Sequence, residues 1–102
     1  MKRALRASIF LGEDDVFEHR PLYHEIVTRA HKAGMAGATV LRGCEGYGAS
    51  SLIHTTRLLS LAENLPVVVI LVDDADKVRG FLGDIPELLT DATVVVDEVE
   101  VR

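Results

Sequence analysis

The chain has few of the residues that cross-link or stiffen small folds. Of its 102 residues, one is cysteine, three are proline and none is tryptophan. The single thiol, Cys44, cannot build a disulfide framework and is typical of a reducing compartment. Because a chain of this length buries roughly two-thirds of its unfolded surface, we expect one domain over residues 1–102 that folds without disulfides or metal.

Aromatic residues and positive charge are also scarce. Aromatics make up 5% of the chain and hydrophobic residues 48%, so the core must be aliphatic. The 16 acidic residues outnumber the 11 basic ones, and the formal net charge is −5. Proteins that bind nucleic acid present a basic face, so this balance argues against a nucleic-acid partner.

Long hydrophobic runs are missing too. The longest apolar stretch, residues 66–72, is far too short to span a bilayer. Near the N-terminus, Arg6 and Ser8 interrupt the apolar residues, and no A-x-A-like cleavage site follows them. We therefore expect a protein that is not exported and that acts in the cytoplasm.

The first half of the chain shows a strand, a helix and a second strand. Apolar residues alternate over residues 5–11, which predicts a strand with one buried face, and residues 12–19 read as a charged loop. Apolar residues at helical spacing then predict a helix that begins at Pro21 and stops at Gly34. Residues 37–41 predict the second strand, which runs into a cluster of glycines.

The second half repeats this order. Residues 65–72 predict a strand that is apolar on both faces, and Asp73 and Asp74 offer a helix N-cap. Apolar residues from Val78 onward predict a second helix, broken near residues 83–86 by glycine and proline. A valine-rich strand over residues 93–101 closes the chain.

Two such halves predict a ferredoxin-like βαββαβ plait of the α+β class. It has a four-stranded antiparallel sheet with both helices on one face and the first and third strands in the centre. Two helices cover one sheet face only, so the valines of the last two strands would leave an apolar patch on the other. A second copy of the chain is the simplest cover. The alternative is that residues 49–64 fold back over the sheet.

The strongest functional signal lies in residues 41–57, after the second strand. Gly43, Gly46 and Gly48 form neither a P-loop nor a GxGxxG motif. They indicate either a bulge or tight turn, or a cradle of backbone N–H groups for an anion or a ring. Tyr47 between them either packs under the segment, or stacks on a base or anchors a neighbouring subunit.

Basic side chains flank these glycines. Arg42 and Arg57 are the best phosphate-binding forks in the chain, unless they are merely solvated. His54 either donates to a ligand phosphate or is an ordinary surface histidine. Cys44 and His54 have no identifiable orienting partner for a nucleophilic pair, so we expect a buried or half-buried cysteine.

Two further patterns give weaker indications of function. Residues 13–15, Glu-Asp-Asp, indicate a solvated loop end, with a ribose or metal contact as the alternative. The sequence from His24 to Thr28 approaches the HExxH motif of zinc proteases but lacks the second histidine. That mechanism needs both imidazoles on one helix face, so we dismiss it.

The motif R-G-x-E-G-Y-G-A at residues 42–49, followed by I-H-T at residues 53–55, resembles the PII-like family called domain of unknown function 190. The similarity covers nearly the whole chain. It implies a regulatory homotrimer whose sheets face inward and which binds an adenine nucleotide between subunits. It also implies that the segment after the second strand docks on a transporter or metabolic enzyme. Together with the chemistry of these side chains, it leads us to expect ligand contacts from Arg42, Gly43, Gly46, Tyr47, Gly48, Ala49, His54 and Arg57.

One difference from PII proteins narrows the choice of expected ligands. Those proteins grip phosphates with a basic, glycine-rich loop before the last strand, whereas residues 83–92 here contain acidic residues and no lysine or arginine. We therefore expect AMP, ADP or a cyclic nucleotide rather than ATP, with no required cofactor and no catalysis. The alternatives are a small ferredoxin-like enzyme, which the aliphatic core positions disfavour, and a CutA-like metal-linked trimer, which the dispersed histidines disfavour.

Overall fold

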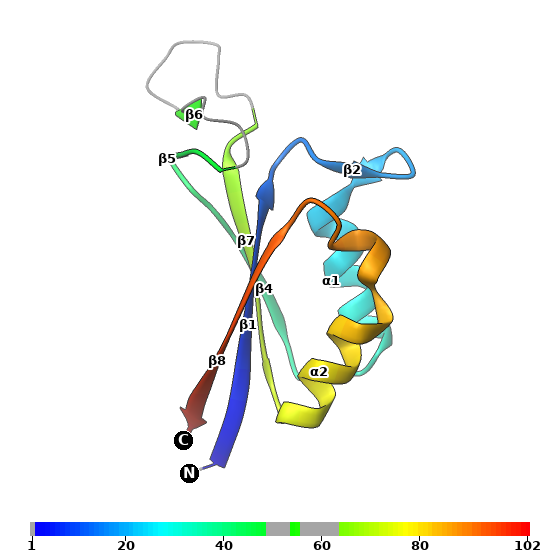
Figure 1. Cartoon of the computed structure of the whole chain (residues 1–102), viewed down its shortest axis with the longest axis vertical. Coiled ribbons are helices and arrows are strands. Elements are labelled where there is room, and N and C mark those ends of the chain that lie inside the picture. The colour runs from blue at the N-terminus through cyan, green and yellow to red at the C-terminus, as the bar shows by residue number, and fades with distance from the viewer. Residues whose placement is uncertain (1, 49–53, 56–63) are drawn as a thin grey trace.

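A four-stranded antiparallel sheet is the centre of the computed structural model, which describes residues 2–48, 54–55 and 64–102. In spatial order, its strands are β4 (Ala38–Arg42), β7 (Pro66–Asp73), β1 (Lys2–Gly12) and β8 (Thr93–Val101). Both helices, α1 (Leu22–Lys32) and α2 (Ala75–Asp84), lie on the same face of the sheet (Figure 1). The predicted ferredoxin-like plait is confirmed, with the first and third predicted strands in the centre.

The helices end where the sequence predicted. Gly34 follows the C-cap of α1 with φ +76°, a conformation that suits glycine, and its N–H donates to the carbonyl of His31. Helix α2 ends at Asp84, and a 3₁₀ helix, η1 (Pro86–Leu88), follows. Pro86 cannot continue an α-helix because it has no N–H to donate. Among the described residues, no helix combines the length and the apolar character needed to cross a membrane.

Between β1 and α1 the structure differs from the expected loop. Short strands β2 (Val16–Phe17) and β3 (Arg20–Pro21) pair as a hairpin. Its two turn residues, Glu18 and His19, have φ of 50° and 69°. Tight hairpins with two positive φ values usually carry asparagine or glycine there, so the sequence contains no recognisable turn signal.

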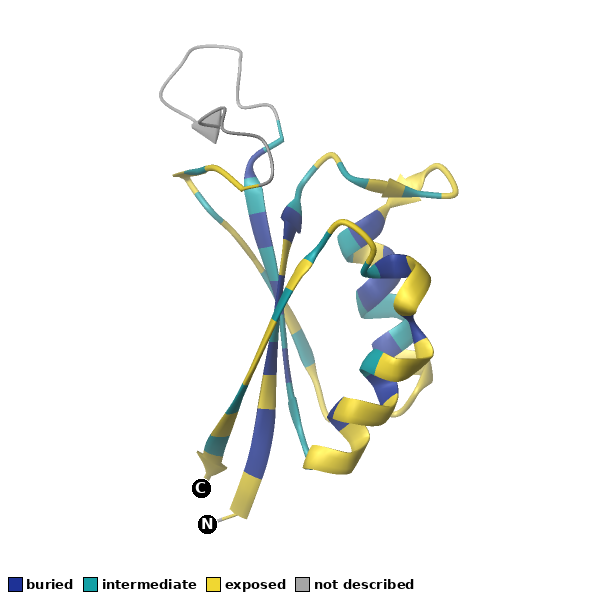
Figure 2. Cartoon of the chain, in the orientation of Figure 1, coloured by how far each residue is buried: buried dark blue, intermediate teal, exposed yellow. Residues whose placement is uncertain are grey.

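The core fills the space between the helices and one face of the sheet. From Leu5 to Leu11 on β1 and from Val67 to Leu71 on β7, the odd-numbered residues face the helices and are buried (Figure 2). Apart from Phe81 on α2, this core is aliphatic, as the composition required. Its main members are Leu5, Ala7, Ile9, Leu11, Val67, Val69, Leu71, Ile26 and Val78.

The opposite face, which we call the open face, carries apolar side chains that no described residue covers. Phe10 on β1, Leu41 on β4 and Val95 on β8 are 47%, 53% and 47% exposed. Near the middle of this face, the Arg6 and Asp97 side chains pair across β1 and β8, with Nη2 and Oδ2 2.8 Å apart. The unequal faces predicted from the sequence are therefore present. The alternative cover, residues 49–64, lies almost wholly outside the described residues.

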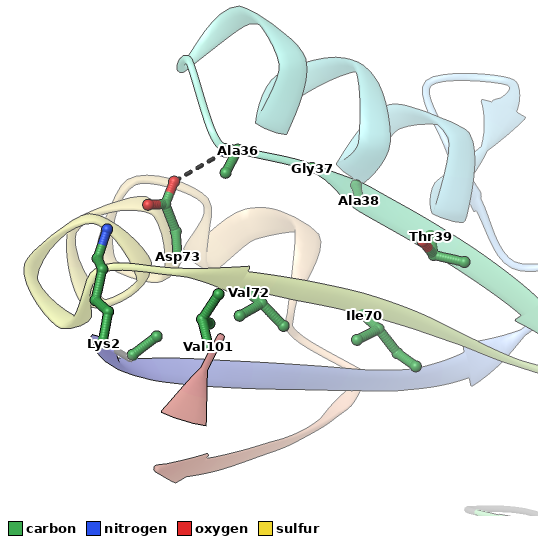
Figure 3. Close-up of a pocket in the computed structure, with 10 residues that line it drawn as sticks. Lys2, Ala36, Gly37, Ala38, Thr39, Ile70, Val72, Asp73 and Val101 are labelled. Atoms are coloured by element: carbon green, nitrogen blue, oxygen red, sulfur yellow. Dashed lines mark hydrogen bonds between the residues drawn. The ribbon is translucent and has the colours of Figure 1, made fainter. Parts of the chain in front are cut away.

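Asp73, at the end of β7, ties three elements together. The expected N-cap residue of α2 is Asp74, but its side chain makes no capping bond. Instead, Asp73 accepts hydrogen bonds from the backbone N–H of Asp74 (2.7 Å) and of Ala36 (2.8 Å), before β4 (Figure 3). Lys77 Nζ lies 3.3 Å from its carboxylate. The Asp74 N–H chiefly, then the Ala36 N–H and Lys77, hold the pKa of Asp73 below its usual range.

We expect Asp73→Ala to lower the free energy of unfolding by about 1–3 kcal/mol, because the N–H groups of Ala36 and Asp74 lose their partner. A depressed folded pKa means that this stabilisation is present above the unfolded pKa and disappears as the pH falls through the folded pKa. Urea denaturation at neutral pH and in acid measures both effects. Asp76→Ala, which removes an exposed acid from the first turn of α2, is the control. Equal losses in the two variants at neutral pH would contradict the role of Asp73.

Candidate functional site

A cavity of about 310 Å³ lies at the end of the sheet where β4 leads into the glycine cluster. Its wall is built from the end of β1, the following turn, strand β5 (Glu45–Gly46), the start of β7 and the start of β8. These segments are far apart in the sequence and meet here because the ends of antiparallel neighbours lie together. The volume is at the lower end of the range for small-molecule sites.

Two aromatic side chains, together with Leu11 and Pro66, form the apolar part of this cavity. Tyr47 is 70% exposed, and Phe10 contributes its ring from the open face. The described residues leave most of the Tyr47 side chain uncovered. The segment under which it was alternatively expected to pack lies almost wholly outside the described residues, so both predicted roles stay predictions. Exposed aromatic rings at a cavity offer surface on which a planar ligand can stack.

The polar part of the cavity is acidic. Asp15 follows β1, Asp91 precedes β8 and Asn64 precedes β7. Carboxylate and amide oxygens accept hydrogen bonds from hydroxyl groups, such as those of a sugar. Among the described residues, no lysine, arginine, histidine or cysteine lines this cavity. It therefore favours a ligand with hydroxyl groups and a planar ring over one with many negative charges.

The packing of the chain explains why two of the clustered positions are glycine. A Cβ atom on Gly43 would lie 2.8 Å from Pro66 Cγ, and one on Gly46 would lie 3.0 Å from it. The Gly43 N–H also donates to the Pro66 carbonyl at 2.7 Å. Gly48 differs, since a Cβ there would meet no described atom within 4 Å. The first two glycines thus allow the chain after β4 to lie directly against β7.

The structure brings three of the predicted ligand residues to the cavity, namely Gly46, Tyr47 and Gly48. Arg42 is not among the residues that line it, and its Nη1 pairs with Glu13 Oε2 at 2.9 Å. Gly43 contacts Pro66 instead.

The remaining predicted residues are only partly described. The backbone of His54 belongs to β6 (His54–Thr55), which pairs with β5, so His54 is opposite Gly46. Ala49 and Arg57 lie outside the described residues. The roles of all these residues as ligand contacts stay predictions.

Several cavity residues escaped the sequence reading. Phe10 looked like one more strand residue, although the period of two places it on the open face. Asn64 and Asp91 sit just before strands and belong to no motif.

The prediction for Cys44 was wrong. Its side chain is exposed rather than buried or half-buried, because it lies between β4 and β5, beyond the main sheet.

A second cavity, of about 380 Å³, lies on the open face at the opposite end of the sheet (Figure 3). Ile70, Val72 and Val101 line its apolar part, and none of the predicted ligand residues lines it. Lys2 at its rim is paired with Asp74 at 2.6 Å. Residues 2–48, 54–55 and 64–102 contain no group of three or more histidine, cysteine or acidic side chains placed to hold a metal ion.

Comparison with known proteins identifies the family. The family model DUF190, described as "Uncharacterized ACR", matches residues 4–101. The chain belongs to the DUF190 family. A UPF0166 protein of Aquifex aeolicus (strain VF5) is 42% identical over 84 residues, which cover 82% of this chain and 78% of that protein. Another UPF0166 protein, from Methanocaldococcus jannaschii, is 29% identical over 96 residues, or 94% and 88% of the two chains. The family predicted from the glycine motif is confirmed.

Solved structures place this DUF190 chain among PII-like folds. CPII, a nitrogen regulatory PII-like protein from Thiomonas intermedia K12, was solved with ADP, AMP and bicarbonate bound. It aligns with a TM-score of 0.71 and 16% sequence identity, covering 98% of this chain and 89% of CPII. At that identity the likeness establishes the fold, which is the PII-like form of the predicted plait.

We expect Gly43→Ala to lower the free energy of unfolding by about 1–3 kcal/mol, because its methyl group would press on Pro66. Gly48→Ala is the matched control, since it removes the same backbone freedom from the unfolded chain and meets no described atom. Urea denaturation of both variants gives the comparison. Equal stability would show that β7 does not require a glycine at position 43.

Proposed function

We propose that this DUF190 chain is a PII-like regulatory protein that binds an adenine nucleotide and signals through the segment after β4. The supporting observation is the cavity that joins Tyr47 and Phe10 to the Gly46–Gly48 turn, at the edge of that segment. CPII, which shares the fold, was solved with ADP and AMP bound. The cavity lining supplies no nucleophile paired with a histidine base among the described residues, so we propose binding without catalysis.

The cavity suggests how such a ligand lies. The base stacks on Tyr47 or Phe10, and the ribose hydroxyls donate to Asp15 or Asp91. Two like charges about 4 Å apart repel by roughly 4 kcal/mol near a protein surface, so these carboxylates disfavour a chain of phosphates. AMP, ADP or a cyclic nucleotide is therefore a better ligand than ATP.

The phosphate needs a cation that the described lining does not supply. We propose Arg57 and His54, which follow the Gly46–Gly48 turn in the sequence, as its partners, together with the backbone of Ala49. Arg42 and Gly43 complete the proposed contacts. For Arg42 to take part, its guanidinium has to leave Glu13, 2.9 Å away.

We further propose that copies of the chain assemble through the open face, as a homotrimer that acts in the cytoplasm. Phe10, Leu41 and Val95 there are each about half exposed, which a lone protomer would leave in water. The trimer is the assembly that the PII-like resemblance implies. The regulated partner, a membrane transporter or a metabolic enzyme, would then contact the segment after β4.

Calorimetric titration of AMP, ADP, ATP and cyclic AMP tests the ligand. We expect binding of AMP that Tyr47→Ala weakens by about 1–3 kcal/mol, the value typical of a base stacked on an aromatic ring. Tyr47→Phe keeps the ring and should bind like the wild type. Absence of binding for all four nucleotides would overturn the proposal.

Light scattering on a sizing column tests the assembly. We expect a trimer mass for the wild type at micromolar concentration and a protomer mass for Val95→Glu, because an unpaired carboxylate in an apolar interface costs several kcal/mol. Arg79→Ala changes the net charge equally on the exposed side of α2 and should remain a trimer. A protomer mass for the wild type would contradict the assembly.

A further inference from the structure

The turn between β1 and β2 is bonded to both strand ends that flank the segment after β4. On one side, Glu13 Oε2 accepts a hydrogen bond from Arg42 Nη1, at the end of β4 (2.9 Å). On the other, the Glu13 N–H donates to the Leu65 carbonyl, just before β7 (2.8 Å). Residues 13–15, which were expected to be a solvated loop end, therefore make specific contacts with the end of β4 and with the residue before β7.

Asp14 and Asn64 make the most specific of these contacts. The Asn64 N–H donates to Asp14 Oδ2 at 2.9 Å, and the Asp14 N–H donates to Asn64 Oδ1 at 3.0 Å. Each residue thus binds the backbone of the other with its side chain. We call this reciprocal pair the Asp14–Asn64 clamp. It joins positions 50 residues apart.

The surroundings of the clamp leave its side chains little freedom. Gly12 packs so closely on the Asn64 amide that a Cβ at position 12 would overlap it. Asn64 has φ of 47°, a left-handed conformation that asparagine tolerates better than most residues. Asp15 Oδ2 accepts from the Gly12 N–H at 2.9 Å, which closes the turn on itself. A braced turn therefore holds the Asn64 side chain in one place.

The clamp and the cavity share one residue. Asn64 lines the cavity, together with Gly12 and Asp15, whereas Asp14 does not. Any effect of Asp14 on a ligand in this cavity must therefore act through Asn64 or through its charge. Removing Asp14 changes the affinity for the ligand in opposite directions by these two routes. Loss of the bond to Asn64 weakens binding, whereas loss of a negative charge near an anionic ligand strengthens it.

We propose that Asp14 is a positioning residue, which through the Asp14–Asn64 clamp keeps Asn64 and the start of β7 in the wall of the cavity. This inference rests on the proposed function, because it assigns the control of that same site. Coupling between two events is reciprocal, so a ligand that contacts Asn64 in its clamped position also tightens the clamp. Occupancy of the cavity is thereby linked to both strand ends that flank the segment after β4.

A pair of substitutions separates the hydrogen bond from the charge. Asp14→Ala and Asp14→Asn both remove the negative charge, but only asparagine keeps an oxygen that accepts from the Asn64 N–H. We expect amide hydrogen exchange at Asn64 to be about fivefold faster or more in Asp14→Ala and within about twofold of the wild type in Asp14→Asn. Asp84→Ala, a charge-matched change on α2, should have no effect. Unchanged exchange in Asp14→Ala overturns the clamp.

Titration of AMP into the same variants tests the link to the cavity. We expect the Kd to rise about fivefold or more for Asp14→Ala, to stay within about twofold for Asp14→Asn, and saturating AMP to slow exchange at Asn64 in the wild type. Faster exchange with an unchanged Kd overturns the positioning role, and so does an equal rise in Kd for both substitutions. If the wild type binds no adenine nucleotide, the proposed function is wrong. The exchange rate at Asn64 alone then tests whether the clamp exists.

Discussion

Two helices cover one face of a four-stranded sheet, and most features of this protein depend on that inequality. The odd-numbered residues from Leu5 to Leu11 on β1 and from Val67 to Leu71 on β7 enter the core, while the even-numbered residues between them point to the open face. Because the side-chain period of a strand is two, β7 can be apolar on both faces and still serve two purposes. One face packs in the core of the protomer, and the other belongs to the open face, the surface proposed for assembly.

The candidate site follows from where the sheet ends rather than from any one element. β1 and β7 are in register such that Gly12 is opposite Pro66. This register brings the turn after β1 to the start of β7. The pairing of β4 with β7, in which Arg42 is opposite Val67, places Gly43 and Gly46 against the Pro66 ring. A slip by one residue would turn every side chain to the other face and would separate Asp14 from Asn64. The core packing of the central strands therefore also holds the wall of the cavity.

Much of the fold could be predicted because it follows from local sequence patterns of apolar residues, glycine and proline. Alternation identified β1, a valine-rich run identified β8, and Pro86 marked the break after α2. The β2–β3 hairpin was not predictable, since Glu18 and His19 adopt left-handed conformations without the usual residues. The site was less predictable than the fold. Arg42 has the chemistry of a phosphate ligand, but Glu13, 29 positions away, competes for the same guanidinium, and only the sheet register reveals that.

The charges of the cavity connect the two proposed properties of this protein. Asp15 and Asp91 face the space that would hold a nucleotide, and the described lining provides no basic side chain to balance a phosphate. An anionic ligand in such a site needs a cation from the segment after β4 or from a neighbouring copy of the chain. Phe10 lines the cavity and also belongs to the open face, so the surface that favours assembly runs into the site. Assembly through the open face would therefore act directly on the cavity, and nucleotide binding would depend on it.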